Sequence, residues 1–467
     1  MSGPDRVRTY FIGIGGSGMK PLARLAAKQG YRVSGSDQAL LEADRARFES
    51  EGIEVFSDVD AGRLQRYDSV VYSSAIGPEH PEFRAAEQRS RAGGLRLFHR
   101  MDFLEVLFRH CTHRFAVAGT HGKTSTSALI GWILLEAGLD PMIAVGGHPL
   151  YLESGIHAGA GDYGAYETDE SDGSFLKCLA PYRLVLNVDH DHLDYYGGSF
   201  DRLRSAFEAF ARSAPIAIVN ADDPSLATLV EAGLQSYTTD PTAEPRPDRV
   251  CGRFDGDSDR LVVKTEQGRV GTIELPVPGR HFASNALGAF ALLRAARVAG
   301  SAELASDEDL IRLINRFPGV ERRMQLIGQI GPVRFLDDYG HHPTEISAVL
   351  KALRHRTEHG ARVLAIFQPH RYTRTRENVA GFAKALRLAD HSWVWPIYSA
   401  GEKPIAGVDA MQIVREAGPS CQSAERGEFE AALQVARAGD VIVCLGAGDI
   451  SKLARDFLRS RSDSLNK

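Results

Sequence analysis

The 467-residue chain has 43% hydrophobic and 25% charged residues and a net charge of −5 at pH 7. These values are typical of a globular enzyme with two to four domains and give no reason to expect a nucleic-acid-binding protein. The five cysteines lie far apart and form no CxxC pair, which argues against structural zinc and for a reducing compartment. The sequence shows no secretory leader pattern and no run of about 18 apolar residues, so we expect a cytoplasmic protein without a membrane partner.

The first predicted unit opens with a strand at residues 8–14, the glycine-rich sequence GIGGSG and a helix through Ala27. A second strand at 31–34 leads to Asp37, as in a dinucleotide-binding fold. Such a loop places a pyrophosphate on a helix N-terminus but leaves open whose pyrophosphate it is, and a glycine turn without a ligand is the alternative. A further strand at 69–73 ends in a small polar loop, where such sheets bind ligands.

A second loop with the pattern of a phosphate site follows an apolar run at 115–118, which predicts a buried strand. The turn GTHG leads into a helix that carries Lys123 and Thr124. In such a loop, backbone N–H groups surround phosphate oxygens, the lysine reaches the β- and γ-phosphates, and the hydroxyl binds Mg²⁺. Val117 stands where the usual motif has its first glycine, so a ligand-free turn is the alternative. We predict a triphosphate site.

Two acidic clusters follow in the same unit. Glu167 opens the first, which has four acidic residues within 167–172 and apolar or aromatic neighbours. A strand at 184–188 leads to the second, DHDHLD, which includes His192. Carboxylates beside a phosphate loop favour Mg²⁺, which takes hard oxygen ligands and substrate phosphates. A solvated acidic turn is the alternative for the first cluster, and zinc, which imidazole prefers, is the alternative for the second.

The segment from about 235 to 271 predicts short β pairs in a small excursion from the core. His281 and Asn285 then precede a strongly apolar helix at 286–299. Four positions apart, they share one helical face at its entrance, where they could read an adenine edge. A polar helix-start residue is the alternative for Asn285. The composition changes around residues 317–319, where we predict a domain boundary.

The last part of the chain predicts a further α/β sheet with strands at 333–336, 362–367, 393–396 and 440–445. The first of these strands ends in DDYGHHPTE, which opens a helix at Pro343, a favoured first helical residue. The second ends in QPHRYTRTR, where three arginines and a histidine predict an anion-binding site, because guanidinium groups match carboxylate and phosphate. A basic surface loop is the alternative.

In this order, the motifs resemble those of the Mur ligase family of peptidoglycan synthesis over essentially the whole chain. They are GIGGSG at 13–18, GTHGKT at 119–124, ETDESD at 167–172, DHDHLD at 189–194, PGRHFASNA at 278–286, DDYGHHPTE at 337–345 and FQPHRYTRT at 367–375. The resemblance implies an α/β fold of three domains. These are an N-terminal Rossmann-like domain for a UDP-sugar at 1–110, a central P-loop-type ATPase domain at 111–318 and a C-terminal Rossmann-like domain for an amino acid at 319–467.

The resemblance also implies site residues. Those for the UDP-sugar are Gly13, Gly15, Gly16, Ser17, Gly18, Asp37, Ser73 and Ser74. Those for ATP are Gly119, Thr120, His121, Gly122, Lys123, Thr124, Ser125, His281, Asn285, Arg323 and Asp338. Thr124, Glu167 and His192 would hold Mg²⁺, expected as two ions with Mn²⁺ as a substitute. The amino acid would contact Tyr339, His342, Arg371 and Arg374, and the catalytic residues would be Lys123, His192, His370, Arg371 and Arg374.

The reaction that the resemblance implies is ATP-dependent joining of L-alanine to the lactyl carboxylate of UDP-N-acetylmuramate through an acyl phosphate, with release of ADP and phosphate. The partners are then these three substrates, with no nucleic acid or membrane, and the chain is a monomer or homodimer. A recycling ligase that attaches a murein tripeptide is the alternative. Two departures from the family are Lys20-Pro21 after the glycines and the lack of any lysine between Lys177 and Lys264, which makes a carbamylated metal-bridging lysine unexpected.

Overall fold

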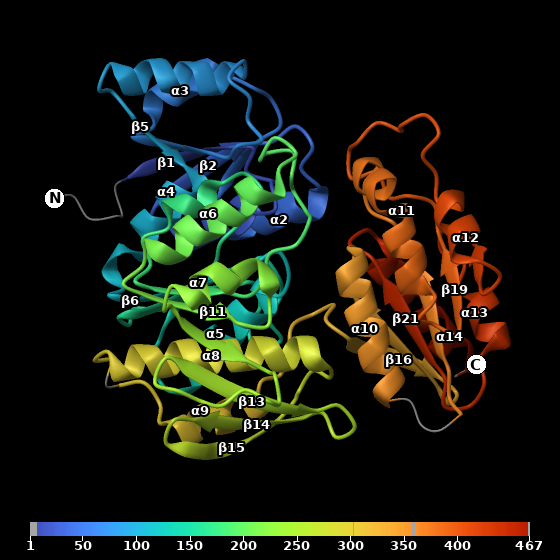
Figure 1. The fold of residues 1–467 in the computed structure, drawn as a ribbon. Coiled ribbons are helices and arrows are strands. Elements are labelled where there is room, and N and C mark those ends of the chain that lie inside the picture. Colours follow the sequence, from blue (N-terminus) through green and yellow to red (C-terminus); the bar gives the residue numbers. More distant parts are fainter. Residues whose placement is uncertain (1–6, 302, 357–359, 466–467) are drawn as a thin grey trace. The chain divides into compact units, whose positions relative to one another are not determined.

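Three sheets organise the chain in the computed structural model, which describes residues 7–301, 303–356 and 360–465 (Figure 1). The chain divides into two compact units. The first consists of the chain up to Gly252 with Val263–Gly271 and Asn285–Pro318, and the second of Arg253–Val262, Thr272–Ser284 and the chain from Gly319.

The first sheet has five parallel strands in the order β3-β2-β1-β4-β5, drawn in blue in Figure 1. Its elements are β1 (Arg8–Ile12), α1 (Met19–Lys28), β2 (Arg32–Ser36), α2 (Glu42–Ser50), β3 (Glu54–Phe56), η2 (Ala61–Arg66), β4 (Ser69–Tyr72), α3 (Pro81–Arg91), β5 (Arg96–His99), α4 (Arg100–Leu107) and η3 (Phe108–His110). The strand order reverses at β1 and β4, and ligands bind at this position in open parallel sheets. The loops after β1 and β4 therefore lie at the edge where we expect a ligand.

The second sheet has ten strands in the order β15-β14-β13-β12-β11-β10-β6-β9-β7-β8. Its elements begin with β6 (His113–Ala118), α5 (Lys123–Glu136), β7 (Met142–Ala144), β8 (Ile156–Ala158), β9 (Tyr163–Glu167), η4 (Ser174–Lys177), β10 (Tyr182–Val185), α6 (Phe200–Arg212) and β11 (Ile216–Asn220). They continue with η5 (Pro224–Leu226), α7 (Ala227–Glu231), β12 (Gln235–Thr238), β13 (Arg249–Asp255), β14 (Arg260–Thr265), β15 (Gly268–Glu274), α8 (Arg280–Val298) and α9 (Asp307–Asn315). Parallel register places Glu167 beside Val117 and Val185 beside Ala118. The acidic cluster and the phosphate loop therefore leave the sheet at the same edge.

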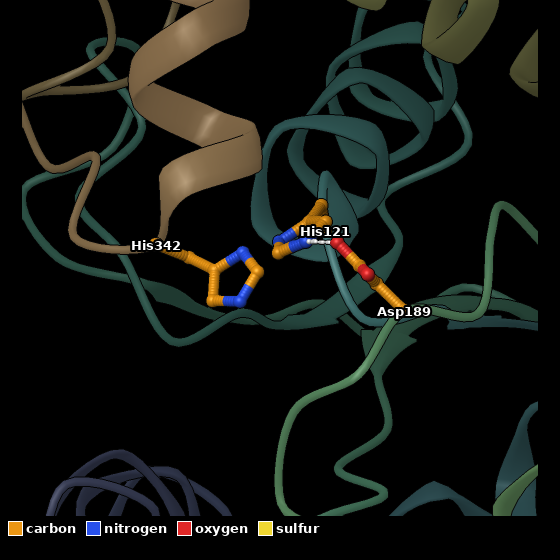
Figure 2. Close-up of side chains that lie close together, drawn as sticks. All are labelled: His121, Asp189 and His342. Atoms are coloured by element: carbon orange, nitrogen blue, oxygen red, sulfur yellow. Dashed lines mark hydrogen bonds and ion pairs between the residues drawn. The ribbon is translucent and has the colours of Figure 1, made fainter. Parts of the chain in front are cut away.

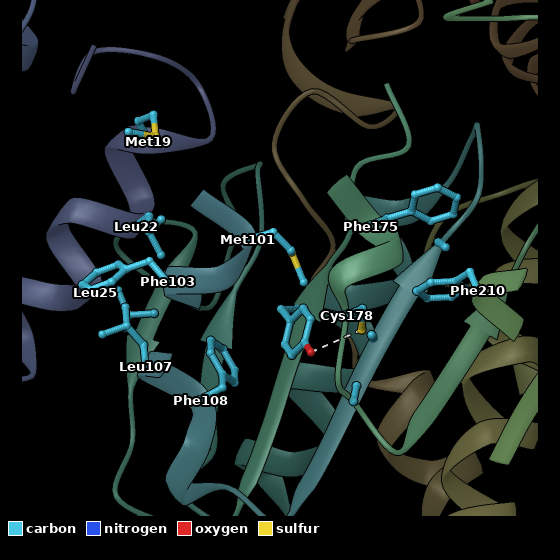
Figure 3. Packing of buried hydrophobic residues seen from close by; sticks show 14 of the residues in the cluster. Met19, Leu22, Leu25, Met101, Phe103, Leu107, Phe108, Phe175, Cys178 and Phe210 are labelled. Carbon is cyan, nitrogen blue, oxygen red and sulfur yellow. Dashed lines mark hydrogen bonds between the residues drawn. The ribbon is translucent and has the colours of Figure 1, made fainter. Parts of the chain in front are cut away.

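One hydrophobic cluster runs from the first sheet into the second (Figure 3). Phe11 on β1 packs edge-on against Phe103 of α4, with ring centroids 5.7 Å apart. Phe108 then packs edge-on against Tyr166 of β9, at 4.8 Å. Gly164 permits this contact, because a Cβ there would lie 2.7 Å from the Phe108 ring. Each large ring buried in this way contributes about 2–3 kcal/mol, so the cluster fixes the two sheets to one another.

The third sheet has the order β16-β17-β21-β18-β19-β20 and is parallel except at the β16 edge. Its elements are β16 (Gln325–Ile330), β17 (Val333–Asp338), α10 (Pro343–Arg356), β18 (Val363–Phe367), α11 (Tyr372–Leu386), β19 (His391–Val394), α12 (Met411–Ala417), β20 (Cys421–Ser423), α13 (Glu430–Val435), β21 (Val441–Leu445) and α14 (Ile450–Leu465). Leu364 and Ile366 belong to the cluster formed with α13 and α14, whereas Phe367 packs at a tilt against Phe382 of α11, with ring centroids 5.0 Å apart. Alternate residues of β18 therefore bury opposite faces of the sheet, as in a doubly wound domain.

The predicted α/β class with largely parallel sheets is confirmed, and two details differ from expectation. The segment expected to hold short β pairs supplies β12 to β15, which extend the second sheet. The apolar helix begins at Arg280 rather than Ala286, directly after Gly279 at φ 103°. His281 and Asn285 therefore lie inside its first two turns. None of the helices in the described residues is long and apolar enough to cross a membrane.

Candidate active site

The phosphate loop joins β6 to α5 through two glycines in the left-handed region, Gly119 at φ 147° and Gly122 at φ 86°. A Cβ at Gly122 would lie 2.8 Å from the side-chain oxygen of Asn285, so this amide packs directly against the loop. Thr120, His121, Lys123, Thr124 and Ser125 complete the predicted loop. The structure therefore brings Asn285 together with the phosphate loop, as the ATP prediction requires.

Lys123 points its ammonium group back into the loop. Its Nζ donates to the carbonyls of Gly119 and Thr120 at 2.6 and 3.2 Å, and to both carboxylate oxygens of Glu170 at 2.9 and 3.0 Å. Burial by itself would lower the pKa of Lys123, but attraction by Glu170 and Asp169 outweighs burial and raises the pKa. Lys123 is therefore a cation at neutral pH. The sequence pattern did not single out Glu170 as its partner.

Thr124 and Glu167 meet at the start of α5. The Thr124 hydroxyl donates to Glu167 Oε2 at 2.7 Å, and the backbone N–H of Gly146 donates to the other oxygen. Burial raises the pKa of Glu167. A hydroxyl and a buried carboxylate are hard oxygen donors of the kind that Mg²⁺ selects, and a cation there would compensate the desolvated charge. These residues fit the predicted metal site.

His192 is not joined to Thr124 or Glu167 by any hydrogen bond or ion pair among the described residues. Its backbone is left-handed, at φ 56°, and its Nε2 lies 3.6 Å from Asp191. A positive φ is uncommon for a non-glycine residue, although histidine tolerates it better than most, so it does not by itself assign a function. The role of His192 as a second metal ligand therefore stays a prediction.

Asp189, the first residue of the DHDHLD segment, and Asn187 just before it hold the phosphate loop in place; Figure 2 shows Asp189 against His121. Asp189 accepts from His121 Nε2 at 2.9 Å, and its backbone N–H donates to the Thr120 hydroxyl at 2.9 Å. Asn187 exchanges two hydrogen bonds with the backbone of His121, at 2.8 and 3.0 Å. Figure 2 also draws His342, which belongs to the second unit. The phosphate loop and this segment thus form one hydrogen-bonded structure. The sequence pattern did not predict that Asn187 supports the loop.

The glycine-rich loop after β1 makes a tight turn into α1. Gly13 is left-handed, at φ 70°, and a Cβ at Gly15 would lie 2.7 Å from the Asp37 carboxylate. Asp37 accepts from the N–H groups of Gly15 and Ala39, both at 2.9 Å. Gly16, Ser17 and Gly18 lead directly into α1. Asp37 thus shapes the loop through these hydrogen bonds, whereas the sequence suggested for Asp37 only a role in ligand binding.

A polar network links Ser74 to the acidic cluster. The Ser74 hydroxyl donates to Asp172 at 2.8 Å and accepts from His99 Nε2 at 2.9 Å. Nε2 carries the proton of this imidazole, because Nδ1 accepts from a backbone N–H. Arg100 Nη2 reaches Asp169 and Asp172 at 3.0 and 3.1 Å. A Cβ at Gly18 would lie 2.8 Å from Arg100 Nη1. Arg100, which sequence analysis missed, therefore joins the glycine-rich loop to the acidic cluster, whereas Ser73 has no described side-chain bond to this network.

A cavity of about 210 Å³ lies between α1, α2 and the loop after β7. Its lining includes Ser17, Lys20, Arg47 and His148. Lys20 pairs with Asp44 at 2.8 Å, so the positive charge of this lysine in the cavity lining is already compensated. Lys20, the residue that departs from the family pattern, faces this cavity rather than the sheet.

In the second unit, the loops after β17 and β18 leave the sheet on either side of Leu445. Asp338 accepts from the N–H groups of Met324 and Gly340, at 2.8 and 2.7 Å, and burial raises its pKa to about 6. Tyr339 lies beneath two guanidinium groups, one of them that of Arg323 at 5.4 Å from the ring centre. The predicted residues Arg323, Asp338 and Tyr339 therefore form one cluster.

Three histidines of this unit are partly buried. Burial lowers the pKa of His341 to about 4, and that of His370 also to about 4 with help from the neighbouring His341. Burial also lowers the pKa of His281 to about 4, and the positive charge of Arg323 contributes to this shift. Nδ1 of His370 has no hydrogen-bond partner among the described groups. His281, His341 and His370 are therefore neutral at pH 7, and the positive charge around them belongs to the arginines.

Arg371 and Arg374 stand at the start of α11. Arg371 has a left-handed backbone, at φ 70°, and Arg374 is buried one turn further along the helix. Arg371 Nε donates to Glu402 at 2.7 Å, a partner that sequence analysis missed. His342, at the start of α10, is also buried. Arg374 is thus buried at the start of α11, whereas Arg371 stays partly exposed, and anion binding by this segment stays a prediction.

Three family models match the chain in order. They are described as Mur ligase family, catalytic domain, at residues 8–111, Mur ligase middle domain at 117–293, and Mur ligase, glutamate ligase domain, at 322–448. A Brucella ovis protein named UDP-N-acetylmuramate–L-alanine ligase is 39% identical over 95% of this chain and 95% of its own. The chain belongs to the Mur ligase family. The family resemblance drawn from the motifs is therefore confirmed.

Two further comparisons agree with this Mur ligase assignment. An Azorhizobium caulinodans protein, also named UDP-N-acetylmuramate–L-alanine ligase, is 38% identical over 95% of this chain and 96% of its own. The crystal structure of UDP-N-acetylmuramate-alanine ligase MurC from Thermotoga maritima matches with a TM-score of 0.78 and 27% identity, covering 98% of this chain and 100% of that one. The three-domain Mur ligase fold is thus confirmed in sequence and in structure.

Proposed function

We propose that this Mur ligase joins L-alanine to the lactyl carboxylate of UDP-N-acetylmuramate, with ATP converted to ADP and phosphate, in peptidoglycan synthesis. The observation that carries this function is the 39% identity, over 95% of both chains, to a relative that is named for this reaction. The charged cluster at the phosphate loop supports it independently, because Lys123, Thr124 and Glu167 are the groups that phosphoryl transfer needs.

Charge explains the first half of the reaction. The lactyl carboxylate attacks the γ-phosphate of ATP, and both groups are anions that repel one another. Lys123 offsets this repulsion, and the loop N–H groups with the N-terminus of α5 hold the phosphates. Thr124 and Glu167 would hold one Mg²⁺, with a second ion near His192, and these ions would supply further positive charge beside the phosphates; Mn²⁺ would serve as a substitute. Asn285, His281, Arg323 and Asp338 are the proposed contacts to the nucleoside.

The second half uses the arginine-rich segment. The product of the first step is an acyl phosphate, which the amine of alanine attacks before phosphate leaves. Arg371 and Arg374 hold the alanine carboxylate, since guanidinium groups match carboxylates in geometry and charge. The neutral His370 is free to donate to or accept from the transferred phosphate, and Tyr339 and His342 complete the amino-acid site. An acyl phosphate hydrolyses in water, so water must be excluded from the site during this step.

The sugar nucleotide is assigned to the first sheet. Its diphosphate lies on the loop of Gly13, Gly15, Gly16, Ser17 and Gly18, with Asp37, Ser73 and Ser74 near by. The cavity beside Ser17 offers space for the adjoining sugar, and its Lys20 and His148 are polar enough to contact hydroxyl groups. We further propose that the enzyme acts in the cytoplasm, where ATP and its sugar nucleotide are available, as a monomer or homodimer.

The deciding experiment measures phosphate release from ATP by the purified chain with UDP-N-acetylmuramate and each candidate acceptor. L-Alanine, glycine, L-serine and the murein tripeptide are offered separately at equal concentration. Release with alanine and not with the tripeptide supports the proposal. Release with the tripeptide alone would assign the chain to the recycling reaction, and tight NAD binding without ATP dependence would reject both.

A further inference from the structure

The segment after β19 forms a wall of the amino-acid site that the family motifs do not include. Tyr398 stacks on His370, with ring centroids 5.7 Å apart and planes at 12°. Its carbonyl accepts from the N–H of Arg371 at 2.8 Å, and its own N–H donates to Pro369 at 2.8 Å. Glu402 ends this segment. The backbone of the arginine-rich loop is thus fixed from one side by residues about 30 positions away in sequence.

Glu402 collects three hydrogen bonds from the start of α11. Its carboxylate accepts from Arg371 Nε at 2.7 Å, from the N–H of Thr373 at 3.1 Å and from the Thr373 hydroxyl at 2.6 Å. Burial by itself would raise the pKa of Glu402, but the Thr373 and Arg371 bonds outweigh it and lower the pKa to about 2. Glu402 is therefore a full anion under all conditions in which the enzyme works.

The geometry of the pair decides which part of Arg371 remains for substrate. A guanidinium group can bind a carboxylate through its Nε edge or through its two terminal nitrogens. Glu402 occupies the Nε edge. Among the described contacts, the side chain of Arg371 has no other partner, and it is 44% exposed. Its terminal edge is consequently the part that a carboxylate can reach.

We infer that Glu402 is a positioning residue for the amino-acid substrate: it holds Arg371 so that the two terminal nitrogens face the carboxylate of the incoming amino acid. This inference rests on the proposed ligase function. The hydrogen bonds of Arg371 to Tyr398 and Glu402 also stabilise its left-handed backbone, which is unfavourable for a residue with a side chain. Glu402 itself does not touch the reacting atoms.

The test is Glu402→Gln, which keeps the shape of the side chain and removes its charge. We expect the KM for L-alanine to rise roughly tenfold, the effect of losing one charge-assisted contact. The KM values for ATP and UDP-N-acetylmuramate and the kcat at saturating alanine should stay within about twofold. Glu402→Asp, which restores the charge, should recover part of the loss.

Two matched variants separate positioning from a merely structural role. Thr373→Val removes the hydroxyl bond to Glu402 but leaves the Arg371 pair, so its KM for alanine should stay close to that of the wild type. Glu428→Gln changes an exposed glutamate of the same unit and should change nothing. Circular dichroism verifies that each variant is folded.

The outcomes are distinct. An unchanged KM for alanine in folded Glu402→Gln would overturn the inference, and so would an equal change in all three KM values. A wild-type chain that releases no phosphate with alanine would overturn the proposed function, and the inference with it. A selective rise in the KM for alanine, with partial recovery in Glu402→Asp, supports both.

Discussion

Two cations that the sequence assigns to anionic substrates, Lys123 and Arg371, are both paired with a glutamate in the structure. The Lys123–Glu170 pair is the more buried, with 19% and 1% of the side chains exposed, whereas Arg371 and Glu402 are 44% and 18% exposed. Glu170 accepts from the single ammonium group of Lys123 through both of its oxygens, while Glu402 uses one edge of a guanidinium fork. Lysine must therefore share or exchange its partner to reach a phosphate, but arginine can bind substrate and partner together.

The largest expected effect comes from removing the buried cation. Lys123→Ala should slow phosphate release, because it removes at least ~3 kcal/mol of transition-state stabilisation. This is the scale of losing one well-placed electrostatic group. The measurement is kcat with UDP-N-acetylmuramate, ATP and alanine at saturation. Lys177→Ala is the control, because that lysine is also paired with a carboxylate, Asp102, but lies at the surface. Phosphate release at the wild-type rate from Lys123→Ala would refute its assigned role.

The next effect concerns the two arginines. Arg371→Ala and Arg374→Ala should each raise the KM for alanine about 10- to 100-fold, because each removes a charge-assisted contact worth about 1.5–3 kcal/mol. The KM for ATP should change far less. Arg376→Ala, an exposed arginine of the same segment, is the matched control. Equal effects on alanine and ATP would count against a role in binding the amino acid.

Removing the buried partner of Lys123 sharpens the comparison. Glu170→Gln leaves the ammonium group without its counter-ion, so the free energy of unfolding should fall by about 2 kcal/mol. The pKa of Lys123 should also fall, since Glu170 is the strongest of the groups that raise it. The alkaline limb of the pH–rate profile should then move to lower pH. Urea unfolding and the pH profile test both points, with Asp102→Asn as control, and an unchanged alkaline limb would show that Lys123 does not titrate there.

Much of this site follows from the sequence because parallel strands place their carboxyl ends at one edge. The apolar run before Gly119 indicates a strand, and the carboxylate expected beside its loop is Glu167, which the parallel register of β6 and β9 places where it accepts from Thr124. The glycine-rich loops were equally clear, since Gly13, Gly119 and Gly122 have the left-handed backbone that such turns need.

The partners of the cations could not be found in the same way. Glu170 stands among four acidic residues that the sequence treats alike, and only the fold selects the one beneath Lys123. Glu402 lies after a different strand, in a segment without a phosphate- or metal-binding pattern. Arg100 is one of many arginines, and its role follows from the close approach of Gly18. Long-range pairing of this kind depends on tertiary packing, which local pattern does not encode.

The smallest expected effect is the contribution of the Arg371–Glu402 pair to the free energy of unfolding, and the pH dependence of this contribution has a definite sign. The pKa of Glu402 is lowered from 4.5 to about 2, so its ionised form is favoured by folding. Its contribution to stability is therefore fully present above pH 4.5 and is lost as the pH falls toward 2. Because both side chains are partly solvated, we expect only about 1 kcal/mol between wild type and Glu402→Gln at pH 6. Urea unfolding at pH 6 and at pH 3.5 should show this difference shrinking, and a difference that grows on acidification would mean that Glu402 does not gain its charge from the Arg371 pair.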